Sequence, residues 1–316
     1  MPENKVKQLT FGAMMTGLFI LLSFLTASPL LAIITVWFIP LPIILYILKY
    51  NLKSSIGIVL IGCLGTFLLT GPIVIGISIV FAVIGMTIGA KAKSNRGKLE
   101  ILLSTALTTM ITVVATIYAS SKFMGINVLE VAMKSLRTGL NSNVKLSEEL
   151  AKTLNQKSTF TQEHANILYK AAENSLPSAL ILSSLLMALL IIIVNFPIIK
   201  KIGYKVPKFG AIKDIRFPGF FLIGYLVVLL IQFLIKPEEG TYFYFVALNA
   251  SLLLDAVFLI QGISFIHFMV HRSNLPKALA WIGTIFAFPL ASFVSILGIL
   301  DIGLNLRVLL GDKTKK

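Results

Sequence analysis

Long apolar stretches separated by short polar connections dominate the pattern along this chain. Nine of them approach or exceed the roughly 20 residues that a helix needs to cross the hydrocarbon layer of a membrane. They cover residues 9–27, 30–48, 54–70, 72–90, 99–119, 176–198, 217–235, 243–270 and 277–300. Backbone groups in hydrocarbon must be paired within their own segment, and the runs lack the alternation of barrel strands. The pattern predicts an all-α polytopic membrane protein with about nine transmembrane helices.

Composition supports a membrane protein and changes how the net charge is interpreted. Of the 316 residues, 57% are hydrophobic and only 13% are charged, against about 25% charged residues in a typical soluble domain. The net charge is +15, but the basic residues lie mainly in the short connections between apolar stretches. Membrane topology and anionic lipid account for that placement. No nucleic-acid motif accompanies the charge, so we expect the lipid bilayer as a partner and no nucleic acid.

The basic residues gather in alternate connections, which indicates which side of the membrane each connection faces. The connection with most of them, residues 199–216, contains Lys200, Lys201, Lys205, Lys208, Lys213 and Arg216. The positive-inside rule therefore places this loop and the N-terminus in the cytoplasm. Nine crossings would leave the basic C-terminal tail outside. A break at Phe288-Pro289 would instead give two half-helices and return the tail to the cytoplasm, and the pattern leaves both arrangements open.

Residues 120–175 form the one long polar segment, and by the span count it lies outside the cell. Apolar residues at helical spacing predict two or three amphipathic helices on the bundle or the membrane, with a mobile linker as the alternative. Ser147 and Thr161, each followed by acidic or amide residues, are predicted helix starts. The chain then divides into a six-span unit, 1–198, with this insert at 120–175. A basic cytoplasmic loop and C-terminal membrane helices follow at 199–316.

Asp255 lies in the middle of the eighth apolar stretch, where a carboxylate is costly unless it is neutral, paired or in contact with water. On a helix it shares one face with Ala247, Ser251, Phe258 and Gly262. We therefore treat Asp255 and Ser251 as candidates for a ligand or proton site, with a structural carboxyl as the alternative. Asn249 and Gln261 are included as candidates, although each is rotated about 120° from Asp255.

The sequence offers little for metal, cofactor or catalytic chemistry. Cys63 is the single cysteine, and the three histidines do not stand at a metal-ligand spacing. Zinc-protease, nucleophile-elbow and phosphate-loop motifs are absent from the sequence. We therefore expect no metal site, no cofactor and no enzyme activity.

Two short patterns are candidates for helix contacts or a family motif. Ala13 and Gly17 in the first stretch form a small-residue pair that allows close approach of another helix, or ordinary packing. Near the C-terminus, Asp301 and Asn305 share a helix face at i,i+4 spacing. Arg307 lies well round the same helix, so we do not expect a direct pair with Asp301.

The chain resembles the YybS-like family of bacterial membrane proteins in three features. These are the segment Gly298–Arg307 with its Asp, Asn and Arg, the first helix with Ala13-xxx-Gly17, and the layout of six spans followed by extra ones. That family is similar to the S components of energy-coupling-factor transporters, which are six-helix proteins that capture vitamins or metals from outside. The resemblance implies a bacterial cell membrane, and docking of Ala13 and Gly17 on a transmembrane coupling subunit driven by cytoplasmic ATPases. The additional C-terminal stretches and the 120–175 segment depart from the six-helix pattern.

These observations lead to one leading function and one alternative. The leading prediction is an S-component-like membrane protein that binds a small molecule or an ion for uptake. The alternative is a membrane scaffold or signalling partner that does not transport.

Overall fold

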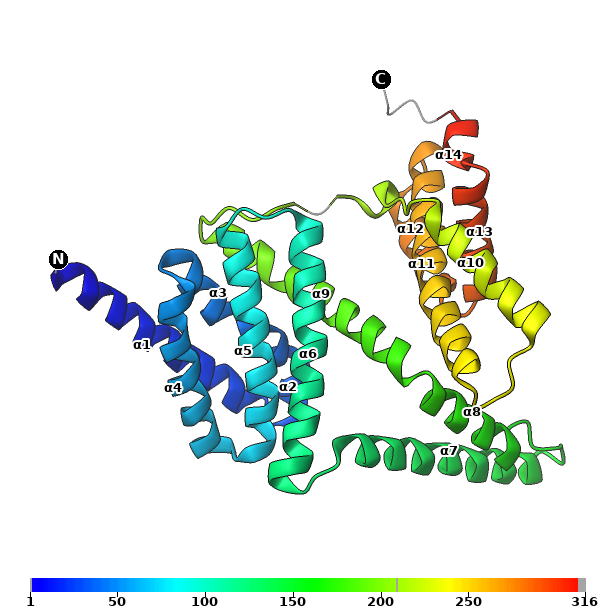
Figure 1. The fold of residues 1–316 in the computed structure, drawn as a ribbon, viewed down its shortest axis with the longest axis horizontal. Helices are drawn as coiled ribbons and strands as arrows, with labels where there is room; N and C mark the ends of the chain where they lie inside the picture. The colour runs from blue at the N-terminus through cyan, green and yellow to red at the C-terminus, as the bar shows by residue number, and fades with distance from the viewer. Residues whose placement is uncertain (1, 209, 312–316) are drawn as a thin grey trace. The chain divides into compact units, whose positions relative to one another are not determined.

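The computed structural model describes residues 2–208 and 210–311, and the regular elements in this part of the chain are all helical. Its elements are α1 (Pro2–Leu25), α2 (Pro29–Thr35), η1 (Val36–Phe38), α3 (Pro40–Lys49), α4 (Leu52–Thr70), α5 (Pro72–Lys93), α6 (Lys98–Met124), α7 (Val128–Thr153), α8 (Gln162–Asn174), α9 (Leu176–Lys201), η2 (Ile212–Asp214), α10 (Phe220–Leu230), the π-helix η3 (Ile231–Ile235), α11 (Tyr242–Arg272), α12 (Lys277–Ala287), α13 (Ala291–Gly303) and α14 (Leu306–Leu309) (Figure 1).

The chain forms two compact units. Unit 1 contains Met1–Ala165 and Leu180–Lys208, and unit 2 contains Asn166–Ala179 and Phe209–Lys316. Helix α9 therefore contributes residues to both. The predicted division of the chain into residues 1–198 and 199–316 stays a prediction.

The structure confirms the membrane helical class and gives a lower count of spans. Within the described residues, seven helices are long and apolar enough to cross a membrane: Lys5–Leu25, Pro29–Lys49, Leu52–Thr70, Pro72–Lys93, Lys98–Met124, Leu176–Lys201 and Tyr242–Arg272. The α12–α13 pair raises the count to eight if it is one broken span. The predicted stretch 217–235 forms a shorter apolar helix, Phe220–Ile235. The count of nine is therefore not confirmed.

The break at Phe288-Pro289 is present. Helix α12 ends at Ala287, α13 begins at Ala291, and the two are bent by 116°. Proline has no backbone N–H to donate to the preceding turn, and its ring clashes with the carbonyl of that turn. The C-terminal apolar stretch is therefore two half-helices joined at a sharp bend.

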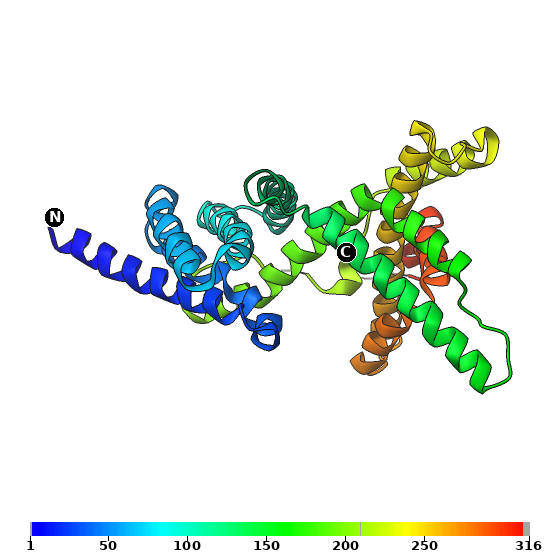
Figure 2. The same cartoon turned by 90° about the horizontal axis from the view of Figure 1, so that it is seen from below.

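Glycines let the helices of unit 1 approach closely. A methyl group at Gly62 on α4 would lie 2.6 Å from the Phe19 ring of α1. On α5, a methyl group at Gly85 would lie 2.9 Å from the carbonyl oxygen of Pro40, and one at Gly89 would lie 3.0 Å from the Ile47 side chain. The space beside Gly62, Gly85 and Gly89 is therefore occupied by neighbouring helices. Helices α4, α5 and α6 lie side by side (Figures 1 and 2).

The 120–175 segment forms two helices, α7 and α8, as predicted. Helix α7 begins after Asn127, whose side-chain oxygen accepts a hydrogen bond of 3.2 Å from the Glu130 N–H. Ser147 lies inside α7, so its predicted helix start is wrong; its hydroxyl instead contacts the Ser158 hydroxyl at 2.9 Å. The prediction at Thr161 is confirmed, because α8 begins at Gln162.

Unit 2 is organised around α11, which packs against α10, α12 and α13. The closest approach is at Gly262 on α11 and Gly298 on α13. A methyl group at Gly262 would overlap the Val294 carbonyl oxygen, and one at Gly298 would overlap the Phe258 carbonyl oxygen. The two backbones are therefore in direct contact, and this crossing positions the polar side chains described next.

Candidate functional site

A buried ion pair lies at the α11–α13 contact of unit 2. The Nε atom of Arg307 donates to Oδ2 of Asp301 at 2.9 Å, and the exposed fractions of the two side chains are 2% and 0%. The Nε2 atom of Gln261 on α11 donates to the same oxygen at 2.5 Å. Within the described residues the other carboxylate oxygen, Oδ1, has no hydrogen-bond partner. Residues from two helices and a short terminal turn therefore meet at one carboxylate.

The pairing of Asp301 with Arg307 corrects the sequence-based expectation. That expectation assumed one continuous helix through Arg307, whereas α13 ends at Gly303. Asn305 takes a left-handed conformation with φ +50°, which turns the chain before α14 begins at Leu306. The turn brings Arg307 back over Asp301. Asn305 also does not share a helix face with Asp301, for the same reason.

Arg307 makes further contacts that satisfy its guanidinium group. Its Nη1 donates to the Lys213 carbonyl oxygen at 2.6 Å, and its Nη2 donates to the Ser264 hydroxyl at 3.0 Å. The guanidinium carbon lies 5.3 Å from the centre of the Phe268 ring, within the range of a cation–π contact. A charged group this deeply buried is stable only with such a set of partners.

The same side chains hold the end of the basic loop. Ser264 Oγ lies 2.7 Å from the Ile212 carbonyl oxygen and 2.8 Å from that of Ile215. Gln261 Oε1 accepts from the Phe217 N–H at 3.0 Å, and Arg216 donates to Asn305 Oδ1 at 2.5 Å. We call this group the loop clamp; its members are Gln261, Ser264, Asp301, Asn305 and Arg307. Its geometry anchors residues 212–217 against α11.

Asp255 lies in a separate environment on the same helix. Its side chain is half-buried, and the Tyr225 phenol of α10 lies beside it. The hydroxyl of Ser295 on α13 reaches the Asp255 backbone carbonyl at 3.4 Å. Among the described residues, no Lys, Arg or His forms an ion pair with this carboxyl. Three helices thus surround a carboxyl group that has a phenol beside it and, in the part of the chain that the structure describes, no cationic partner.

The other two candidates near Asp255 in the sequence are placed elsewhere. Asn249 joins α11 to the α8–α9 junction: its Oδ1 accepts from the Ser178 N–H at 2.9 Å, and its Nδ2 donates to the Asn174 carbonyl at 3.0 Å. Gln261 belongs to the loop clamp. Ser251 does lie one helical turn from Asp255, and its hydroxyl accepts from Gln232 Nε2 at 2.8 Å.

A small cavity in unit 2 lies beside the first turns of α11. Its volume is about 250 Å³, and it is lined by Gln232, Lys236, Pro237, Tyr244, Ala247 and Leu248. Ala247 is one turn from Ser251, which is one turn from Asp255. The polar groups Gln232 and Ser251 therefore stand between the cavity and the carboxyl group.

Over residues 2–208 and 210–311, no three His, Cys, Asp or Glu side chains come together as a metal site. His267 instead pairs with the Thr284 hydroxyl at 2.8 Å. Cys63 is buried and has a free thiol.

The predicted docking pair lies on the outer side of α1. Ala13 and Gly17 are exposed, and nothing lies within 4 Å of the position of a methyl group at Gly17. The neighbouring Gly12 is the residue that faces the unit, 3.5 Å from Tyr46 by the same measure. Whether a partner covers Ala13 and Gly17 stays a prediction.

The sequence alone pointed to Asp255, Gln261, Asp301 and Arg307 but missed Ser264 and Tyr225. Ser264 follows Gln261 by three residues, so the spacing i,i+3 placed both on one face. For Tyr225 no local signal existed, because its proximity to Asp255 depends on how α10 packs on α11.

Comparison with known proteins identifies one relative and one matching family model. The chain is 28% identical over 320 residues to a protein of Bacillus subtilis (strain 168) named Uncharacterized protein YybS, with 96% of this chain and 98% of the relative aligned. No solved structure shows a significant match. The family model described as predicted membrane protein (DUF2232) matches residues 16–302, a stretch that includes both Asp255 and Asp301. The match covers well over half of the chain, so the protein belongs to this family of membrane proteins, as the YybS-like resemblance predicted.

Proposed function

We propose that this chain is a substrate-binding membrane protein of the S-component kind, and that it holds a small cation, or the ammonium group of a small molecule, at Asp255. The observation that carries the proposal is the half-buried Asp255 carboxyl in the middle of α11 with no cationic partner among the described residues.

The depth of Asp255 in α11 makes its ionised form unfavourable in free energy. It stands thirteen residues after Tyr242, the first residue of α11, and seventeen before Arg272, the last. At 1.5 Å per residue, about 20 Å of helix lie on one side and about 26 Å on the other. An ionised carboxylate at such a depth costs about 3 kcal/mol on insertion scales. The Tyr225 phenol offsets part of that cost, and a bound cation supplies the missing opposite charge.

The cavity at the start of α11 gives a ligand an entry. Its volume of about 250 Å³ suits a hydrated ion or a small ammonium compound better than a vitamin-sized molecule. The Gln232–Ser251 hydrogen bond lies between the cavity and Asp255, and both side chains present oxygen atoms that can bind a cation on its way in. We therefore propose a small ligand.

Uptake is the second part of the proposal. Ala13 and Gly17 are exposed on α1 with open space above Gly17, which suits close contact with a helix of another protein. In the S-component family that partner is a transmembrane coupling subunit driven by cytoplasmic ATPases. We propose the same partner here, and no catalytic step by this chain.

One observation favours the alternative, a membrane scaffold that does not transport. Helix α7 is 26 residues long, and Val144 is its single buried residue. Several apolar side chains on it are more than half exposed, among them Val131, Leu146 and Leu150. Such a surface suits a partner protein or the membrane surface.

The cation site is tested on purified protein with named probes. We would record the midpoint of thermal unfolding in detergent with lithium, sodium, potassium, ammonium and methylammonium chlorides, using N-methylglucamine chloride to hold ionic strength constant. A ligand at about 100 times its dissociation constant stabilises a protein by about 2.7 kcal/mol. We expect one of the probes to raise the midpoint of the wild-type protein, and Asp255→Asn to lose that increase.

Glu173→Gln is the matched control, because it removes the same charge from an exposed position in unit 2. It should keep the wild-type response. If Asp255→Asn responds to every probe as the wild type does, Asp255 does not bind the cation. Purification from native membranes separates the two functions: coupling ATPases favour uptake, and other stoichiometric partners favour the scaffold.

A further inference from the structure

Helix α7 of unit 1 exposes a stripe of apolar side chains along its length. The stripe, which we call the α7 stripe, consists of Val128, Ala132, Leu136, Leu146 and Leu150, all of them exposed. At 3.6 residues per turn, these residues lie within about 80° of one another around the helix. Every charged residue of α7 lies outside this sector, and the two residues that interrupt the stripe, Gly139 and Asn143, are uncharged. The helix is therefore amphipathic, with a continuous uncharged side.

The rest of the insert covers a different side of α7. The Ser147 hydroxyl contacts the Ser158 hydroxyl at 2.9 Å and accepts from the Phe160 N–H at 3.2 Å. Val144, the buried residue of the helix, is rotated by about 120° from the centre of the stripe. Within the described residues, the fold of the insert thus leaves the α7 stripe uncovered.

The chain reaches α7 directly from a membrane-spanning helix. Helix α6 is long and apolar enough to cross the membrane and ends at Met124, and α7 begins at Val128. The connection allows at most about 15 Å between these two residues. Gly125 has φ +65°, a left-handed conformation that lets the chain turn sharply. Figures 1 and 2 show α7 running across the end of α6, so α7 starts at the membrane surface and extends along it.

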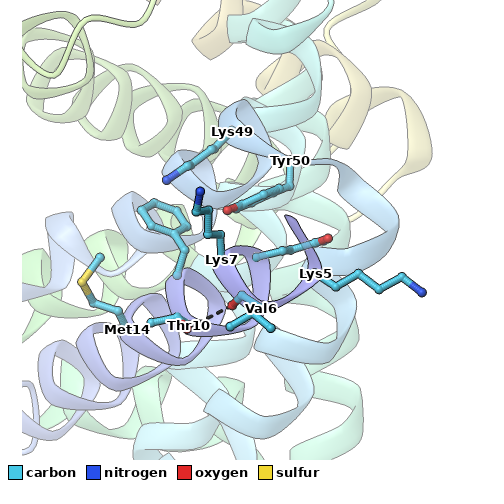
Figure 3. A pocket seen from close by; sticks show the side chains of 9 residues that line it. Lys5, Val6, Lys7, Thr10, Met14, Lys49 and Tyr50 are labelled. Carbon is cyan, nitrogen blue, oxygen red and sulfur yellow. Dashed lines mark hydrogen bonds between the residues drawn. The ribbon is translucent and has the colours of Figure 1, made fainter. Parts of the chain in front are cut away.

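The basic residues of unit 1 mark the end opposite to α7. Figure 3 shows Lys5 and Lys49 where the start of α1 meets the end of α3. Lys93 donates to the Tyr50 carbonyl oxygen, which places the end of α5 there as well. Helix α6 begins nearby at Lys98, and its 27 residues extend about 40 Å from this end. Because the positive-inside rule places the basic end in the cytoplasm, α7 lies on the outer side.

These observations favour lipid over a protein as the partner of the α7 stripe. Amphipathic helices of this kind lie between lipid headgroups and acyl chains, with the apolar side about 5–10 Å deep. A soluble partner protein could cover the stripe, but it would not account for a helix that begins where a span leaves the membrane and runs across the end of that span. We propose that α7 lies on the outer surface of the cell membrane with the α7 stripe inserted among the lipids. The proposal holds whether the chain takes up a ligand or serves as a scaffold.

The test places a single tryptophan on α7 and measures its quenching by lipid. The two natural tryptophans, Trp37 and Trp281, are replaced by phenylalanine, and the full-length protein is reconstituted in vesicles of phosphatidylglycerol and phosphatidylcholine in equal parts. The phosphatidylcholine is either unlabelled, brominated near the glycerol end of its acyl chains, or brominated near their tail end. We expect Leu136→Trp and Leu150→Trp to lose most of their emission in the first brominated lipid and less in the second, because the stripe is shallow.

Lys145→Trp is the matched control, because Lys145 is exposed on the same helix and rotated by about 140° from the centre of the stripe. It should keep its emission in both brominated lipids and be quenched by acrylamide from the water. Equal quenching of Leu136→Trp and Lys145→Trp by lipid overturns the proposal. Short-wavelength emission from Leu136→Trp without quenching by lipid also overturns it, in favour of a protein surface over the stripe. Quenching at Leu136→Trp but not at Leu150→Trp shows that α7 leaves the membrane, and it contradicts the proposal.

A spin label decides the proposal even if the tryptophan variants fail to fold. In Cys63→Ala protein, a nitroxide attached to Leu136→Cys should be more accessible to oxygen, which is concentrated in lipid, than to a water-soluble nickel complex. A nitroxide at Lys145→Cys should show the opposite preference. A preference for the nickel complex at Leu136→Cys overturns the proposal.

Discussion

Breaking the buried ion pair of the loop clamp gives the sharpest test of the structure. Arg307→Met keeps the length of the side chain and removes its charge. It leaves the Asp301 carboxylate, which is fully buried, with Gln261 as its remaining partner. Removing one member of a buried pair costs about 3–5 kcal/mol, because the other charge remains uncompensated. We expect Arg307→Met to destabilise unit 2 by about 4 kcal/mol.

The double variant Asp301→Asn/Arg307→Met should be more stable than Arg307→Met alone. The asparagine removes the unpaired charge, and its side-chain oxygen still accepts from Gln261. What remains lost are the hydrogen bonds from Arg307 to Ser264 and to the Lys213 carbonyl, worth about 1–3 kcal/mol in total. Adding a second substitution should thus restore about 1–3 kcal/mol.

The two tryptophans, Trp37 and Trp281, make the measurement specific to one unit. Trp37 belongs to unit 1 and Trp281 to unit 2. In a Trp37→Phe background, fluorescence during unfolding by increasing denaturing detergent reports unit 2 alone. A double variant as unstable as the sum of its two single variants would refute the reasoning, because the pair would then contribute no coupling energy.

Three further predictions concern packing, docking and topology. Gly262→Ala should lower the unfolding midpoint strongly, because its methyl group overlaps a carbonyl oxygen of the facing helix. Gly224→Ala is the control: its methyl group would lie 4.0 Å from the nearest side chain, so the midpoint should change little apart from the effect of helix propensity. Equal changes in the midpoint would contradict the close crossing of α11 and α13. Gly17→Leu should fold normally and recover less partner protein from native membranes; unchanged recovery would reject the docking role. In a Cys63→Ala background, a cysteine introduced at Lys205 should not be labelled by membrane-impermeant thiol reagents in intact cells, because we place this loop in the cytoplasm. Labelling at this position would contradict the predicted topology.

The apolar runs of the sequence were enough to predict the helical membrane class and the position of most spans. Hydrocarbon imposes a length and a helical conformation on each run, so local composition determines both. Pro289 also marked the break between α12 and α13 correctly, because the missing N–H is a local property. Ser147 shows the limit of such local signals: it has the composition of a helix start, but Asn127 had already started α7.

The loop clamp could be predicted only as a set of unusual residues. The separation of Asp301 from Arg307 was calculated for one straight helix, whereas a left-handed Asn305 turns the chain between them. Asn is among the residues that adopt this conformation most readily, and Gly303 before it is a common helix end, so the signal existed but was not decisive. Gln261 meets Asp301 across forty residues of sequence, a contact that depends on tertiary packing.

The clamp also sets an order of events during synthesis. The bond from Arg307 to the Lys213 carbonyl joins residues 94 positions apart. At about 5–20 residues per second, the ribosome needs roughly 5–20 s to make the intervening chain. During that interval residues 212–217 exist without the arginine that fixes them, and helices α10 to α13 are made while this loop is still unanchored. Unit 2 therefore reaches its final form only after Arg307 and the rest of α14 have been made.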